Sequence, residues 1–178
     1  MCIRDRFLAR HPDALRVLPV AGPSLRPPES YASVPYHGIH AFRWIDAAGG
    51  ERYVRYKLVP EAPGRYLNPL QARRQARDYL RQEIRQRVAR GPVRFGLEVQ
   101  IAAAGDQVDD PSRAWPKTRP RTRVGAFEIT GLDTERERGD DVLVFDPTRL
   151  TDGIEPSDDP VLRFRPQAYG ESVARRTS

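Results

Sequence analysis

The stretch FDPTRLTDGIEPSDDPVLRFRPQAYGESVARR, residues 145–176, carries the strongest local structural signals in the chain. Ser157 stands at a typical helix N-cap position, two acids follow it, and apolar residues are frequent from 161 to 164. Small polar caps, acids in the first turn and a following apolar run are typical of the start of a helix. We therefore predict a C-terminal helix that Pro166 interrupts and Gly170 weakens.

Alternating apolar residues predict strands upstream of this tail. In 93–101 every second residue is Val, Phe, Leu or Ile, which gives one apolar face and one mainly polar face. The segments 39–45 and 52–59 flank the turn residues 46–50 and predict a β-hairpin. A further short strand is predicted at 124–130.

One long helix is predicted between these strands. Asn68 can cap it, Pro69 suits the first helical position, and Gly91 can end it. Apolar residues recur every fourth position from Leu80 to Val88, so one face of this helix should pack against another part of the protein.

Two segments rich in proline and polar residues, 21–35 and 103–123, predict connections without regular structure. The chain shows neither an internal repeat nor a change of composition that would mark a second domain.

Composition excludes several classes of protein. The chain has 178 residues, 39% hydrophobic and 30% charged, with one Cys and one Met, which excludes a disulfide scaffold and stable membrane insertion. Its net charge is +6, and Lys57 and Lys117 are the only lysines among 30 basic residues, so the other 28 are arginines. These arginines are interspersed with acids and form no basic block, so we expect no nucleic-acid partner.

Common catalytic and metal-binding motifs are absent. The chain contains no GxGxxG, Walker-type loop, GxSxG or CxxC motif. His37 and His40 lie three residues apart, but on a strand this spacing points the two side chains to opposite faces. We therefore expect no zinc site at these histidines.

A series of short motifs runs through the chain in a fixed order. They are GIHAF at 38–42, WP at 115–116, VG at 124–125, FDP at 145–147, GIEPS at 153–157 and Arg-x-x-x-Tyr at 165–169. In order and spacing, this series resembles the haem catalase family over residues 7–176. The resemblance implies an α+β fold: a partial catalase-like antiparallel β-barrel with flanking helices and a C-terminal helix that carries the haem ligand.

The resemblance also implies roles for individual residues. Tyr169 would be the axial ligand of the haem iron, with Arg165 on its oxygen, His40 near Arg165, and Asp159 near His40. These three neighbours, Arg165, His40 and Asp159, would form the catalytic machinery on this side of the haem. The chemistry is reasonable, because a tyrosine ligates ferric iron as a phenolate although its hydroxyl has a pKa of about 10, and a guanidinium can stabilise that anion.

Three further residues match family positions that contact haem. Phe145 and Val161 match residues that line the macrocycle, and Arg176 matches an arginine that pairs with a propionate. Each site residue also has a simpler interpretation. Phe145 and Val161 would then be core residues and Arg176 a solvated arginine, while Tyr169 would be a half-buried helix tyrosine and Asp159 an acid favoured by the helix dipole.

The tail also departs from the larger catalases. Ser172 and Val173 stand where those enzymes have Thr-His, and Pro166 has no counterpart there. The chain resembles instead the short catalase-related haem peroxidases. The resemblance therefore implies a haem-dependent oxidoreductase, of homo-oligomeric build, that consumes hydrogen peroxide or another small peroxide. The alternatives are a related haem enzyme acting on organic or fatty-acid hydroperoxides, and a barrel that binds a ligand without catalysis.

The first six residues are unlike the rest of the chain. The only Cys and the only Met lie in MCIRDR, residues 1–6, which we expect to be a non-native artefact. Residues 7–178 would then be a partial catalase-like domain that holds the proximal half of the site. The distal His expected from the family lies on a segment that this sequence does not match, so we expect little or no peroxide turnover from the chain alone.

Overall fold

The computed structural model describes residues 26–62, 64–133 and 144–177. The artefact expected at residues 1–6 lies outside this part of the chain. The described residues form an antiparallel sheet with the strand order β5-β4-β3-β2-β6, and β1 pairs with β3 beside this path. The strands are β1 Tyr36–His37, β2 Phe42–Ile45, β3 Glu51–Pro60, β4 Val93–Ile101, β5 Arg121–Ile129 and β6 Ile154–Pro156.

The predicted hairpin is present as β2 and β3. Its turn closes because the Oδ1 atom of Asp46 accepts hydrogen bonds from the backbone N–H groups of Ala48 and Gly50, at 2.9 and 2.8 Å. Gly49 adopts a φ of +81°, which favours glycine. The first strand of this hairpin is shorter than predicted, because the chain is irregular from Gly38 to Ala41, where it carries His40.

β4 has the predicted bounds, and its alternation sets the position of the core. Its apolar face contributes to two hydrophobic clusters at opposite ends of the strand. Ala32, Val88, Val93 and Phe95 form one cluster, and Phe42, Val54, Val99 and Leu162 form the other. Because Leu162 lies in the C-terminal helix and is fully buried, the second cluster fixes that helix to the sheet.

The single long helix predicted from Asn68 to Gly91 is wrong. The structure has two helices, α3 Pro69–Arg73 and α4 Tyr79–Arg90, separated by turns. Asn68 does cap α3, but no residue of α3 is buried, so packing does not extend this helix towards α4. The apolar stripe lies entirely within α4, whose first residue, Tyr79, donates a hydrogen bond from its hydroxyl to the Pro28 carbonyl at 2.8 Å.

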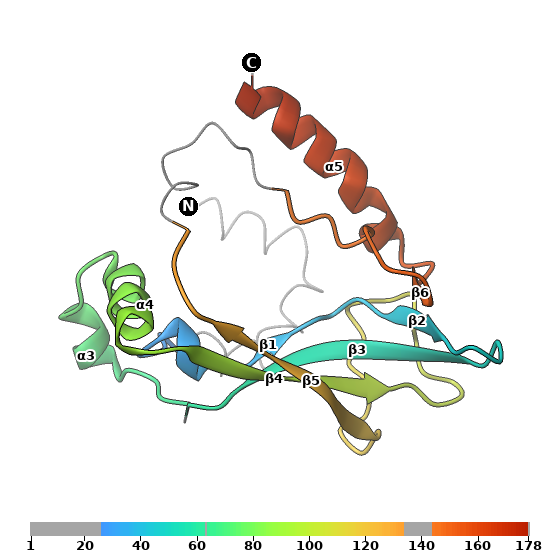
Figure 1. The fold of residues 1–178 in the computed structure, drawn as a ribbon, viewed down its shortest axis with the longest axis horizontal. Coiled ribbons are helices and arrows are strands. Elements are labelled where there is room, and N and C mark those ends of the chain that lie inside the picture. The colour runs from blue at the N-terminus through green and yellow to red at the C-terminus, as the bar shows by residue number, and fades with distance from the viewer. Residues whose placement is uncertain (1–25, 63, 134–143, 178) are drawn as a thin grey trace, which may run out of the picture.

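The predicted interruption of the C-terminal helix at Pro166 is also wrong. Helix α5, Pro160–Thr177, continues through Pro166 and Gly170. A proline removes only one N–H from the helical ladder, and the bonds before and after it can keep the helix continuous. In Figure 1, α5 touches the sheet only near its first turn, beside β2 and β6, and then projects away from it.

Smaller differences concern short elements. The segment 21–35 was predicted to lack regular structure, but it contains a 3₁₀ turn, η3 Tyr31–Ser33, whose N-cap is Ser30. Neither β1 nor β6 was predicted, because two or three residues are too few to show a period. None of the helices in the described ranges has the length and apolar character needed to span a membrane.

Within the described residues the sheet does not close into a barrel. Its outer strands are β5 and β6, and eight of the nine residues of β5 are exposed. The expected α+β architecture, a partial antiparallel barrel with flanking helices, is therefore the one observed (Figure 1).

Candidate functional site

The candidate site begins where α5 begins, at Asp159. This side chain is fully buried, and its two oxygens have different partners. Oδ1 accepts hydrogen bonds from the backbone N–H groups of Val161 and Leu162, at 2.8 and 3.3 Å, and Oδ2 lies 2.6 Å from Nδ1 of His40. Asp159, followed by Pro160, is therefore the N-cap of the helix, and the prediction that Ser157 caps it is wrong.

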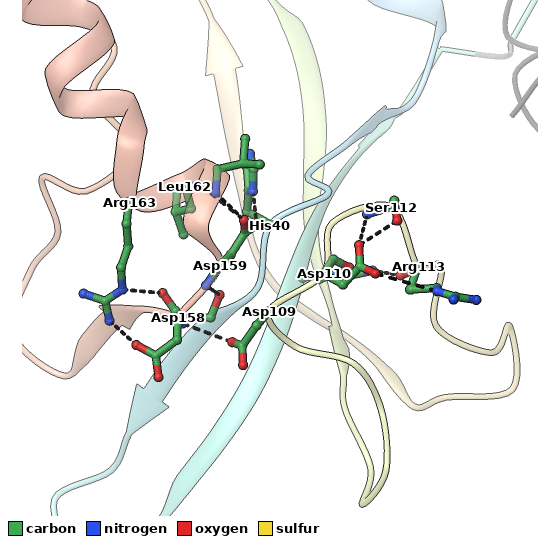
Figure 2. Close-up of polar contacts among 12 residues, drawn as sticks. His40, Asp109, Asp110, Ser112, Arg113, Asp158, Asp159, Leu162 and Arg163 are labelled. Carbon is green, nitrogen blue, oxygen red and sulfur yellow. Dashed lines mark hydrogen bonds and ion pairs between the residues drawn. The ribbon is translucent and has the colours of Figure 1, made fainter. Parts of the chain in front are cut away.

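Ser157 is displaced from the capping position but still supports it. Its hydroxyl oxygen accepts a hydrogen bond from the Asp159 N–H at 3.4 Å. Arg163, one turn into the helix, donates from Nε to the Ser157 carbonyl at 3.1 Å and from Nη2 to Oδ1 of Asp158 at 2.6 Å. Figure 2 shows how these polar groups gather around the first turn of α5.

His40 reaches Asp159 because the backbone around it is held close to β3 and β6. The Gly38 N–H donates to the Tyr56 carbonyl at 2.8 Å, and a Cβ at Gly38 would lie 3.2 Å from the same oxygen, so glycine suits this close approach. On the other side, the Ser157 N–H donates to the Ala41 carbonyl at 3.2 Å. The expected proximity of His40 and Asp159, which are 119 positions apart, is thus present in the structure (Figure 2).

Arg165 and Tyr169 lie further along α5, and both are partly buried. The Arg165 guanidinium carbon lies 5.7 Å from the centroid of the Tyr169 ring, within the range of a cation–π contact. Arg165 thus contacts the face of the ring, whereas the resemblance placed it on the phenol oxygen. Within the described residues no hydrogen bond joins His40 to Arg165, so the structure shows two separate pairs instead of one continuous chain.

The remaining predicted residues are accessible. Phe145 is 78% exposed and Val161 54% exposed, so neither is a core residue of the described part of the chain. Phe164, also on α5, is 58% exposed. Arg176 donates from Nε to the Ser172 carbonyl of its own helix at 3.1 Å. The helix that carries Arg165 and Tyr169 therefore exposes two large apolar side chains, Val161 and Phe164.

Sequence reasoning missed Arg55, a buried cation behind the site. It lies on β3 between Val54 and Tyr56. Because neighbouring side chains of a strand point to opposite faces of the sheet, the alternation of apolar and polar residues predicts that Arg55 faces solvent. Instead it is only 7% exposed, because the connection between β4 and β5 covers this face. Burial lowers the pKa of the Arg55 guanidinium, and the negative charge of Asp159 is the foremost of the nearby charges that oppose this shift. The WP motif was the available signal, since Trp115 stacks on Arg55.

Comparison with known proteins gives a consistent family. The Catalase family model matches residues 5–178. A catalase-related peroxidase of Mycolicibacterium paratuberculosis is 54% identical over 170 residues, which cover 96% of this chain and 54% of the relative. A catalase-related peroxidase of Synechococcus elongatus is 34% identical over 154 residues, covering 86% of this chain and 45% of the relative. The chain thus spans about half the length of these curated relatives.

Solved structures resemble the fold. Catalase A from Saccharomyces cerevisiae superposes with a TM-score of 0.75 at 22% identity, over 84% of this chain and 33% of that one. A fungal catalase superposes with a TM-score of 0.73 at 24% identity, over 84% of this chain and 32% of that one. At these identities the likeness concerns the fold, and it identifies the open sheet with flanking helices as a catalase-like α+β arrangement.

Proposed function

The chain belongs to the catalase family, and from this premise we propose that it forms part of a haem-dependent oxidoreductase that consumes hydrogen peroxide. The observation that carries the proposal is the arrangement on α5, where the Arg165 guanidinium lies over the ring of Tyr169 at 5.7 Å. Positive charge thus lies next to the tyrosine that, in this proposal, ligates ferric iron as a phenolate.

The residues present fit a haem group. In this proposal the Tyr169 oxygen is the axial donor, and Arg165 supplies the neighbouring positive charge. The exposed apolar side chains of Phe145 and Val161 offer the hydrophobic surface that a macrocycle requires, which gives a physical reason for their exposure. Arg176 is the candidate partner of a propionate. When bound, haem would supply the redox chemistry of peroxide cleavage.

The other site residues hold this arrangement in place. Asp159 fixes the first turn of α5 through two backbone N–H groups and holds the His40 ring through its second oxygen. Since Tyr169 is ten residues further along the same helix, the position of its oxygen depends on how firmly this first turn is held. His40 and Asp159 thus contribute by orientation.

Two spectra test the proposal directly. The chain, expressed with haem supplied, should show the visible absorption of a ferric haem ligated by a phenolate, and Tyr169→Phe should abolish that absorption. Tyr66→Phe is the matched control, because Tyr66 is 42% exposed and lies next to α3, away from α5, so its spectrum should equal that of the unchanged protein. Haem ligation that Tyr169→Phe leaves unaltered would contradict the assignment.

A further inference from the structure

The connection between β4 and β5, residues 102–120 and here termed the β4–β5 loop, is fastened to the sheet by one buried side chain. Arg55 projects from β3 into this loop and donates three hydrogen bonds to its carbonyl groups. They run from Nη1 to Arg113 at 2.6 Å, and from Nη2 to Asp110 at 3.1 Å and Gln107 at 3.4 Å. The guanidinium suits this role because its N–H donors lie on separate nitrogens of a rigid planar fork.

Aromatic packing completes the attachment. Trp115 is 6% exposed, and its ring centroid lies 4.3 Å from the guanidinium carbon of Arg55. The indole N–H donates to the Gln107 carbonyl at 2.8 Å, so the loop also closes on itself. Asp106 and Arg119 hold the two ends of the loop together through two hydrogen bonds, of 2.7 and 2.9 Å. The loop is therefore built as a rigid element.

The same loop reaches the start of α5. Oδ1 of Asp109 accepts a hydrogen bond from the backbone N–H of Asp158 at 3.0 Å, immediately before the capping residue Asp159. Figure 2 shows the Asp109 side chain extending from the loop towards Asp158, with Asp159 and His40 above that contact in this view. A continuous set of contacts thus leads from Arg55 to the capped first turn of the helix.

We propose that the β4–β5 loop is a positioning element for α5, in which Arg55 fixes the loop to the sheet and Asp109 holds the residue before the helix cap. Arg55 and Asp109 act through Asp159 and are positioning residues. The consequence for haem binding rests on the proposed function, since it requires that Tyr169 be the ligand. The mechanical step, restraint of the first turn by the loop, is independent of haem.

The first experiment measures amide hydrogen exchange at Val161 and Leu162, the N–H groups that Asp159 caps. Asp109→Ala should speed their exchange about fivefold, the effect of losing one hydrogen bond of ordinary strength. Asp109→Asn should leave exchange as slow as in the unchanged protein, because the amide oxygen can accept the same hydrogen bond. Glu128→Ala, which removes an exposed acid from the edge strand β5, is the control and should change neither rate.

The second readout separates positioning from general stability. The ¹⁵N signals of the His40 ring should shift in Asp109→Ala but not in Asp109→Asn. The urea midpoint of Asp109→Ala should fall by no more than about 0.5 M, which corresponds to the same fivefold change, and that of Asp109→Asn should stay close to that of Glu128→Ala. Arg55→Lys keeps the positive charge but has a single nitrogen in place of Nη1 and Nη2, so it should loosen the loop and speed exchange at Val161 and Leu162 at least as much as Asp109→Ala does. Unchanged exchange in Asp109→Ala, within twofold of the unchanged protein, would overturn the proposal even if Arg55 variants fail to fold.

In the haem-loaded protein, Asp109→Ala should shift the phenolate absorption, and Asp109→Asn should restore it. An absorption unaffected by Tyr169→Phe would refute the proposed function but leave the exchange result valid. The positioning role alone would be refuted if the absorption depended on Tyr169 but Asp109→Ala left it unchanged. In that case amide exchange and the His40 ring signals would also match those of the unchanged protein.

Discussion

Replacement of Asp159 tests the geometry of the candidate site most directly. Its side chain is fully buried, caps α5 through Oδ1 and holds His40 through Oδ2 at 2.6 Å. Asp159→Ala removes both interactions. Asp159→Asn keeps an oxygen for the cap, because asparagine caps helices about as well as aspartate, but it loses the charged hydrogen bond to His40.

The expected magnitudes follow from these contacts. Loss of an N-cap costs about 1 kcal/mol, and loss of a hydrogen bond to a charged group about 1.5–3 kcal/mol. Asp159→Ala should therefore lower the free energy of unfolding by about 3 kcal/mol, and Asp159→Asn, which loses only the hydrogen bond to His40, by about 1.5–3 kcal/mol. With a urea dependence of about 2 kcal/mol per M, the alanine variant should unfold at a midpoint about 1.5 M lower.

The assay is urea unfolding followed by the fluorescence of Trp44 and Trp115. The neighbouring Asp158 provides the control, because its side chain is 79% exposed and its ion pair with Arg163 is solvated. Such pairs contribute less than about 1 kcal/mol, so Asp158→Ala should shift the midpoint little. If Asp159→Ala were no more destabilising than Asp158→Ala, the two roles assigned to the Asp159 oxygens would be refuted.

Three further predictions concern other parts of the fold. Gly153→Ala should destabilise the protein by about 1–2 kcal/mol, because the native φ is +79° and a Cβ would lie 3.1 Å from the Ile45 carbonyl oxygen. Gly170→Ala in α5 should stabilise it by about 0.5–1 kcal/mol, since among the described residues only its chain neighbours and its own helix backbone lie within 4 Å of the new Cβ. Thermal unfolding of both variants tests the opposite signs. The hydrogen bonds from Arg119, and then that from the Ala103 N–H, hold the pKa of Asp106 below its usual range. A lowered native pKa stabilises the fold above about pH 4 and is lost as the pH falls through it, so Asp106→Asn should lose less stability than the unchanged protein between about pH 5 and pH 2.5. Equal losses in urea unfolding at the two pH values would count against this pair.

Local periodicity determined much of the sheet before any tertiary information. The alternation in 93–101 predicted β4 with its observed bounds, and the hairpin of β2 and β3 followed from two apolar segments and an intervening turn. These predictions succeed because burial of one face imposes a period of two on the residues of the strand itself. The motif series likewise indicated the catalase family, which the comparisons confirm.

Helix boundaries depended on contacts that the local sequence does not contain. The predicted long helix divides because only the α4 half has a sheet to pack on, and α5 continues through Pro166 although the local rule predicts a break. Ser157 and Asp159 are both good capping residues, and the local sequence could not choose between them. In the structure Asp159 caps the helix, and its second carboxylate oxygen contacts His40.

The sequence by itself therefore determined the family, the main strands and the presence of a C-terminal helix, because each is encoded in period, capping residues or ordered spacing. Only the tertiary structure decided which of those residues meet. Asp159 and His40 lie 119 positions apart and join through the pairing of β2 with β6, and Arg55 becomes buried because a distant loop covers its face of the sheet. Such contacts depend on the path of the whole chain, which no local pattern records.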